Sequence, residues 1–229
     1  AAVGVSGELD AHGAALLADG LSPLYVAAAG QVIGVAGVGD PLRADARATV
    51  AALQRQGIEP WILSGDHPVV VSRVAASLGI PAAHASGGMS PEDKRDRVRD
   101  FVAARHGKGR LAMVGDGVND AAAMALSDVG VAVEGGAGAA LLAADVVVTR
   151  GGLSPLLDLL RGSRRLLGVI YRNLGFSLLY NIAGATLAIM GLVGPLLAAV
   201  LMPISSLTVI LSSVLARSFP DLRGRGVAP

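Results

Sequence analysis

The feature that most constrains this chain is a long run of residues without charge. From Asn173 to Ala216 the sequence contains no Asp, Glu, Lys or Arg, and this length suits two membrane spans of roughly 20 residues each. Gly191 to Pro195 can form the turn between them. Two helices that are apolar all round could also be the core of a soluble protein, but they would need a larger protein around them. We therefore predict a pair of transmembrane α-helices.

The residues that flank this run predict its orientation, because Lys and Arg accumulate on the cytoplasmic side of membranes. Arginines occur on both flanks, at Arg161, Arg164, Arg165, Arg172, Arg217, Arg223 and Arg225. We expect an integral protein of the cell membrane, in contact with the lipid bilayer, with both termini in the cytoplasm. The net charge of +1 gives no sign of nucleic-acid binding, and the absence of cysteine excludes disulfides and thiolate metal sites within the chain.

The segment from Asp40 to Thr149 alternates between strand-like and helix-like patterns. Apolar runs at Trp61 to Leu63 and at Leu111 to Val114 are separated by helical patterns, one of which begins at Ser90 and Pro91. This order is typical of βαβ units. We therefore predict an α/β fold, Rossmann-like, with parallel strands.

An acidic loop that contains glycine follows the second of these runs, in MVGDGVNDAAAMALSDVGVAV. Asp116 and Asp120 would lie at the carboxyl edge of the sheet, where open α/β sheets bind ligands, and their carboxylates suit Mg²⁺. Asn119 can hydrogen-bond to the loop or to a ligand. The same residues could instead form a solvated turn that caps the next helix. Two further groups favour a phosphoryl-transfer site: Ser64-Gly65-Asp66 and Pro91-Glu92-Asp93-Lys94.

In this order and spacing, SGD, PEDK and MVGDGVNDAAAMALSDVGVAV resemble the phosphorylation domain of P-type cation ATPases, which has the haloacid dehalogenase-like fold. The resemblance implies that Asp116 and Asp120 hold Mg²⁺ and that Lys94 contacts the phosphoryl group. It also implies ATP as a second cofactor.

The same resemblance assigns roles to two more segments. In SGD, the Ser64 hydroxyl would touch the phosphate beside Gly65, and Asp66 would help to position the water that attacks the aspartyl phosphate. In VGDPLRADA, which is similar to the family's hinge, Asp40 and Arg43 are assigned to cofactor binding. Taken singly, Ser64 and Asp66 could be helix caps, and Lys94 could be a solvated surface residue.

The family carries its phosphorylated aspartate in an Asp-Lys-Thr-Gly-Thr motif, and no Asp-Lys-Thr-Gly occurs in these 229 residues. We expect a C-terminal fragment that is inactive alone and whose partner is the missing N-terminal part of the same pump. The expected parts are the end of a nucleotide-binding domain, the phosphorylation domain, two transmembrane helices and a cytoplasmic tail, at 1–38, 39–162, 163–219 and 220–229.

Polar residues within the two predicted spans indicate the cation. They are Tyr180, Asn181, Met202, Ser205 and Ser206, and they resemble the copper(I) branch of the heavy-metal subgroup, with its Tyr-Asn pair and Met-x-x-Ser-Ser. A soft thioether suits Cu(I), whereas zinc or calcium would favour the carboxylates that the spans lack. The same side chains could merely pack the helices or anchor them at the interface. We favour Cu(I) as the transported cation.

The sequence thus predicts part of an ATP-driven heavy-metal cation pump, a translocase that couples formation and hydrolysis of an aspartyl phosphate to transport. One alternative is a membrane-tethered haloacid dehalogenase-like phosphatase, because soluble members share a loop similar to GDGVND. Another is a noncatalytic truncated product. The hinge-like segment and the polar residues inside both spans favour the pump.

Overall fold

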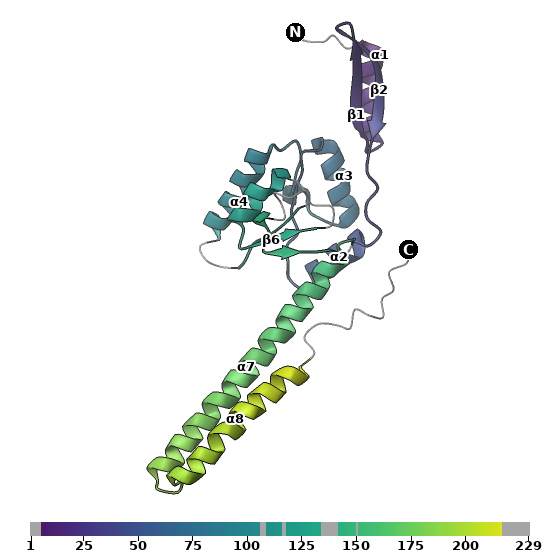
Figure 1. The fold of residues 1–229 in the computed structure, drawn as a ribbon. Coiled ribbons are helices and arrows are strands. Elements are labelled where there is room, and N and C mark those ends of the chain that lie inside the picture. Colours follow the sequence, from purple (N-terminus) through teal and green to yellow (C-terminus); the bar gives the residue numbers. More distant parts are fainter. Residues whose placement is uncertain (1–5, 106–108, 116–117, 134–141, 150, 217–229) are drawn as a thin grey trace. The chain divides into compact units, whose positions relative to one another are not determined.

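The computed structural model describes residues 6–105, 109–115, 118–133, 142–149 and 151–216. The chain divides into two compact units, Ala1–Pro155 and Leu156–Pro229. The first unit holds a helix with a β-hairpin and then an α/β part, and the second holds a pair of helices (Figure 1).

The N-terminal segment consists of α1 (Gly7–Ala18), β1 (Ser22–Ala28) and β2 (Gln31–Val38). The two strands pair antiparallel, with an irregularity between Val26 and Ala27. Both strands precede the hinge-like segment. Helix α1 begins where the Ser6 side chain accepts a hydrogen bond from the Leu9 backbone N–H at 3.4 Å.

The α/β part alternates helices with short parallel strands, as predicted. Its elements are α2 (Ala46–Arg55), β3 (Ile62–Leu63), α3 (Pro68–Leu78), η1 (Ala82–His84), β4 (Ala85–Ser86), α4 (Pro91–Ala104), β5 (Ala112–Gly115), η2 (Val118–Asp120), α5 (Ala121–Leu126), β6 (Val129–Ala132) and β7 (Val146–Val147). Strand β3 pairs with β4, and β5, β6 and β7 form a second sheet in that order. Within the described strands, no ladder hydrogen bond joins the two sheets.

Local sequence accounts for the ends of the two longest helices in this part. Helix α3 has Pro68 in its first turn and ends at Gly79, whose φ of 70° is a conformation that glycine adopts without strain. Helix α4 begins with the predicted Ser90 and Pro91, and the Ser90 and Asp93 side chains each accept a hydrogen bond from the other residue's backbone N–H.

A small apolar core packs α2 against α3. Its buried members are Ala46, Val50, Ala75, Leu78 and Ile80. Ile62 of β3 and Ala85 of β4 pack against this cluster. The core therefore supports the short β3–β4 sheet, and the candidate residues Ser64, Gly65 and Asp66 directly follow β3.

The second unit is a helical hairpin. Helix α7 (Ser154–Ile189) begins in the first unit and continues into the second, and α8 (Pro195–Leu215) returns after a turn in which Gly191 has φ 73°. The turn lies where the sequence predicts it. The expected domain boundary between residues 162 and 163 falls inside α7.

Polar side chains join the two helices of the hairpin. Arg172 donates to the Ser212 hydroxyl, which donates to Asn173, and the Asn173 amide donates to Ser213, all at 2.8–2.9 Å. Of the helices in the described part of the chain, none is both long and apolar enough to cross a bilayer. The predicted transmembrane pair is therefore not confirmed.

Candidate functional site

An ion pair between Lys94 and Asp120 lies at the carboxyl end of β5. The Lys94 Nζ is 2.9 Å from Asp120 Oδ1, and the two side chains are 14% and 12% exposed. The capping box positions Lys94, because it fixes the first turn of α4 and Lys94 follows it directly. The hydrogen bonds of the capping box lower the pKa of the Asp93 carboxyl, and the one from the Ser90 backbone N–H contributes most. The alternative of a solvated surface lysine is wrong.

Asp120 is buried at the start of α5, where its carboxylate faces Gly115. A Cβ at Gly115 would come within 2.5 Å of Asp120 Oδ2, so the carboxylate occupies space that only glycine leaves open. Asp120 makes no side-chain cap hydrogen bond to α5, so the alternative of a turn that caps this helix is not observed for Asp120. Asn119 is exposed in η2. Asp116 lies outside the described residues.

A second pair of polar side chains lies at the carboxyl end of β3. The Ser64 hydroxyl donates to Asp66 Oδ2 at 2.7 Å and accepts from the Asp66 backbone N–H at 3.2 Å. Neither residue caps α3, because His67 occupies the cap position and accepts from the Val69 N–H through Nδ1 at 3.3 Å. The alternative in which Ser64 and Asp66 are mere helix caps is wrong, and Asp66 is exposed to solvent.

A short loop connects the two pairs. The Met89 N–H donates to the Ser64 carbonyl at 3.0 Å, and Gly88 donates to the Asp66 carbonyl. This loop leads directly into α4 and Lys94. Gly87 permits the close approach, because a Cβ there would lie 2.7 Å from Pro68 Cα and 2.8 Å from the Asp66 carbonyl oxygen. Gly87 was missed by the sequence analysis, although the glycine pair at 87–88 signals a tight turn.

The hinge-like segment contributes through a residue that the sequence analysis did not select. Asp40 and Arg43 are exposed, whereas the Asp45 carboxylate accepts hydrogen bonds from the backbone N–H groups of Leu153 and Ser154 at 2.7 Å each. Burial acts to raise the pKa of Asp45, but these hydrogen bonds outweigh it and lower the pKa. Asp45 therefore fastens the start of α7 to α2.

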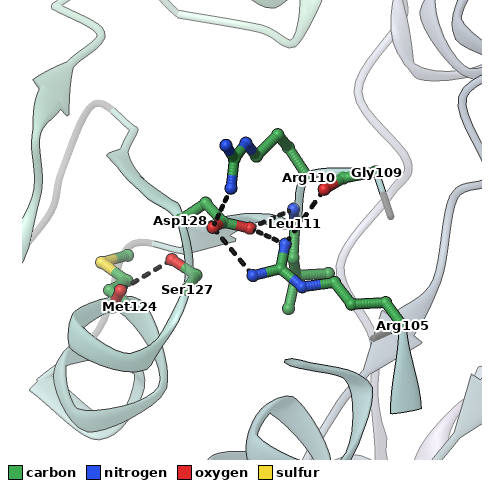
Figure 2. A network of polar contacts seen from close by, with 7 residues as sticks. All are labelled: Arg105, Gly109, Arg110, Leu111, Met124, Ser127 and Asp128. Carbon is green, nitrogen blue, oxygen red and sulfur yellow. Dashed lines mark hydrogen bonds and ion pairs between the residues drawn. The ribbon is translucent and has the colours of Figure 1, made fainter. Parts of the chain in front are cut away.

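Asp128, within the quoted motif, anchors the amino ends of β5 and β6 (Figure 2). Its carboxylate pairs with Arg105 and Arg110 and accepts from the Leu111 N–H at 2.7 Å. The hydrogen bond from Arg105, and then that from Leu111, holds the pKa of Asp128 far below its usual range. Because this network lies at the opposite end of β5 from Asp120, it supports the strand and does not belong to the candidate site.

The residues predicted to contact the transported cation lie on both helices of the hairpin. The Tyr180 hydroxyl donates to the Leu201 carbonyl at 2.8 Å, so it faces α8 beside Met202, whose side chain lies outside the described residues. Asn181 is exposed and contacts Ser177 within its own helix at 3.5 Å. Ser205 is half-buried and Ser206 is exposed. No group of three or more His, Cys, Asp or Glu in the described part of the chain forms a metal site.

The residues around Asp120 nevertheless suit a magnesium phosphate ligand. Mg²⁺ is commonly held by one or two carboxylates, with phosphate and water completing its shell. Asp120 provides one carboxylate, for which Gly115 leaves room, and Lys94 provides a positive charge for a phosphoryl oxygen. Asp120 can thus bind the magnesium of such a ligand, and Lys94 can bind its phosphate.

Comparisons with known proteins show which family the chain belongs to and which proteins it is similar to. A model of the haloacid dehalogenase-like hydrolase family matches residues 2–128. The copper-transporting ATPase of Saccharomyces cerevisiae is 34% identical over 221 residues, covering 89% of this chain and 22% of that protein. The probable copper-exporting P-type ATPase V of Mycobacterium tuberculosis is 35% identical over 201 residues, covering 87% of this chain and 25% of that protein.

A solved structure is similar over nearly the whole chain. The crystal structure of a zinc-transporting PIB-type ATPase in the E2.Pi state matches with a TM-score of 0.77 at 28% identity, covering 93% of this chain and 34% of that one. The chain spans about a quarter of the length of the two curated relatives. The resemblance that the three sequence motifs indicate is confirmed.

Proposed function

Because the chain belongs to the haloacid dehalogenase-like hydrolase family, we propose that it forms the magnesium- and phosphate-binding part of a heavy-metal-transporting P-type ATPase. The observation that carries this proposal is the Lys94–Asp120 pair, 2.9 Å long and mostly buried, at the carboxyl end of a parallel strand. Ligands of open α/β sheets bind at such ends. The nature of the relatives, copper and zinc pumps by name, supports the pump over a free-standing enzyme.

In this proposal each side chain has a defined task. Lys94 Nζ would leave Asp120 to hold a phosphoryl oxygen, while Asp120, together with Asp116, would hold Mg²⁺. Bound magnesium would supply positive charge against the charge that develops on the phosphoryl oxygens. The Ser64 hydroxyl would turn from Asp66 to donate to the phosphate, and the exposed Asp66 carboxylate would orient the attacking water and accept its hydrogen bond.

The acceptor aspartate of this reaction must come from outside these 229 residues, because they contain no Asp-Lys-Thr-Gly. Phosphoryl transfer depends on positioning around an in-line nucleophile. We therefore expect no ATP turnover by the chain alone, and we expect the domain of residues 39–162 to act with the nucleotide-binding and upstream parts of the complete pump. Asp40 and Arg43 would lie at the junction with the nucleotide-binding part.

A titration of the chain with Mg²⁺ and inorganic phosphate tests the site without turnover. We expect the amide NMR signals of Lys94 and Asp120 to shift when both ions are present. Asp120→Asn should abolish the effect of Mg²⁺, and Lys94→Gln should weaken phosphate binding. Asp96→Asn is the matched control, because Asp96 is a half-buried acid of α4, the helix of Lys94, and it pairs with Arg95 and Arg99. Unshifted signals in the unsubstituted chain would refute the assignment.

In the complete pump, Asp120→Asn should lower ATP hydrolysis by about 100-fold or more, since it removes a preorganised electrostatic group from the transition state. The phosphatase alternative rests on the match to a hydrolase family over residues 2–128. It predicts that the chain alone hydrolyses small phosphoesters in the presence of Mg²⁺, and that Asp66→Asn stops this hydrolysis.

We also place the helical hairpin in the membrane of the complete pump, with both ends in the cytoplasm. The charge-free run from Asn173 to Ala216 supports this placement, as do the large apolar side chains exposed on both helices, such as Leu179 and Leu196. Topology reporters fused after Pro229 and near the amino end should both report the cytoplasm. A report from the opposite side at one end would overturn the paired arrangement.

Cu(I) is the cation that the polar residues of the hairpin favour. The Tyr180 hydroxyl bonds the carbonyl next to Met202, a thioether suits Cu(I), and both curated relatives named above are copper pumps. The zinc pump with the similar structure supports Zn²⁺ as the competing cation. Tyr180, Asn181, Ser205 and Ser206 are the other residues that we propose along the path.

Copper-dependent ATP hydrolysis and Cu(I) stoichiometry of the complete pump test this choice. Met202→Leu nearly conserves volume and should cost less than about 1.5 kcal/mol in stability, yet it should abolish stimulation by Cu(I). Asn181→Ala is the second variant, and Met190→Leu, close to the turn, is the matched control. Stimulation by Zn²⁺ alone, or unchanged copper activity in both variants, would reject Cu(I).

A further inference from the structure

A groove of about 500 Å³ lies between the two helices of the hairpin, at the end opposite the turn. It is lined on one side by Arg165, Gly168 and Arg172 of α7 and on the other by Ser212 and Leu215 of α8. Its volume lies within the roughly 300–1,000 Å³ of sites that hold small organic ligands. All of these residues belong to one compact unit.

Two arginines and a serine, Arg165, Arg172 and Ser212, make the groove basic and polar. Arg165 and Arg172 are seven residues apart, so they lie two helical turns apart on the same face of α7, at a spacing of about 10 Å. The Arg172 guanidinium donates to the Ser212 hydroxyl at 2.8 Å, which holds it at the edge of the groove. Every lining residue is basic, hydroxyl-bearing, apolar or glycine, so an anion meets no opposing carboxylate from the walls.

A smaller depression of about 130 Å³ continues from the same place. It shares Arg172 and Ser212 with the groove and is otherwise lined largely by carbon, including Phe176 and Val209. The surface therefore changes from charged to apolar along the helices. A ligand that matches both parts has an anionic head and a hydrocarbon tail.

We propose that this groove binds one anionic phospholipid, with its phosphate between Arg165 and Arg172 and an acyl chain along Phe176 and Val209. Arginine binds phosphate through paired N–H donors, and basic residues directly outside a membrane span attract anionic lipid headgroups. Arg172 immediately precedes the charge-free run. The proposal rests on the membrane placement of the hairpin given under the proposed function.

Gly168 leaves the entrance to the groove open. A Cβ at this position would meet no atom within 4 Å apart from its own helix. The Cβ of Gly168→Leu therefore meets no clash, and its larger side chain narrows the groove without a change in charge. This variant separates binding in the groove from general attraction between arginines and an anionic surface.

The test uses the 229-residue chain in phosphatidylcholine vesicles that contain a trace of spin-labelled lipid. The electron paramagnetic resonance spectrum gives the association of spin-labelled phosphatidylglycerol relative to spin-labelled phosphatidylcholine. We expect selectivity for phosphatidylglycerol, reduced about fivefold by Arg165→Gln and by Arg172→Gln. Gly168→Leu should also reduce it. Arg161→Gln is the matched control, because Arg161 is exposed and does not line the groove.

The possible outcomes distinguish a failure of the lipid site from a failure of the membrane placement of the hairpin. If alkaline carbonate extracts the chain from the vesicles, the membrane hairpin is wrong and the lipid site fails with it. If the chain resists extraction but shows no selectivity, or if Arg161→Gln lowers selectivity as much as Arg172→Gln, only the lipid site is wrong. Displacement of the lipid by millimolar inorganic phosphate would show a phosphate site in its place. Far-ultraviolet circular dichroism verifies that each variant keeps its helices.

Discussion

The α/β part and the helical hairpin place their large apolar side chains in opposite surroundings. In the α/β part, Val98 and Met124 are 2% and 1% exposed. On α7 of the hairpin, Leu178 is 59% exposed and its neighbour Leu179 more so. The α/β part therefore carries its own core, whereas both helices of the hairpin leave large apolar side chains uncovered.

The two regions also differ in what holds their polar side chains. In the α/β part, short loops and backbone hydrogen bonds hold Ser64, Asp66 and Lys94 at strand ends. In the hairpin, side chains such as Asn173 and Ser212 join one helix to the other. The first arrangement is set by the chain itself, and the second leaves the outer faces of both helices open. Four substitutions test this difference between the two regions.

Met124→Ala should have the largest effect. Met124 is fully buried in α5, and its truncation removes apolar burial and leaves a cavity, at a cost of about 2–5 kcal/mol in the free energy of unfolding. Urea unfolding followed by the fluorescence of Trp61, the chain's single tryptophan, measures the loss. Leu126→Ala, at an exposed position of the same helix, should cost much less. Equal losses would mean that α5 is not packed as described.

Gly87→Ala should rank second, at about 1–3 kcal/mol. The new Cβ would meet backbone atoms of Pro68 and Asp66, which cannot move aside as a flexible side chain can. We also expect weaker phosphate binding, because the loop holds Ser64 and Asp66. Gly34→Ala in β2, where a Cβ meets nothing within 4 Å, is the control. A variant at Gly87 with unchanged stability and binding would contradict the role of this loop.

Asp45→Asn should cost about 1 kcal/mol at neutral pH, as does the loss of a helix cap. Because the folded-state pKa of Asp45 is lowered, its contribution is complete above the ordinary value of about 3.9 and is lost as the pH falls through the folded-state pKa. The stability difference between the two proteins should therefore shrink below about pH 4. Urea midpoints at a series of pH values measure it, and a constant difference would exclude the charge of Asp45 as its cause.

Leu178→Ala should have the smallest effect, within about 0.5 kcal/mol. The side chain is exposed on α7, so its truncation in the free chain removes little burial. Thermal unfolding followed by Trp61 measures the α/β part in this variant. A loss as large as that of Met124→Ala would show that the apolar surface of α7 is packed in the free chain. The two regions would then not differ in the burial of their apolar side chains.

Much of the fold and part of the site could be predicted from the sequence because the patterns that carry them are local. Gly79 ends α3, Ser90 and Asp93 begin α4, and the turn at Gly191 closes the hairpin, each through contacts within a few residues of the chain. The confirmed resemblance also depends on short motifs, each of which follows a strand or begins a helix. The membrane placement and the roles of the candidate site residues, Asp116 among them, stay predictions.

Only the tertiary structure decided which distant groups meet. Lys94 and Asp120 are 26 residues apart, and Asp45 and Ser154 are 109 apart, so neither contact leaves a periodic pattern in the sequence. Each depends on how strands and helices pack, and the same carboxylate could have faced water in another packing. Local sequence patterns thus set the elements and the kinds of chemical group at their ends, because these follow from local hydrogen bonding and periodicity. The tertiary structure determined the partners of these groups, because burial and charge pairing act between segments far apart in the chain.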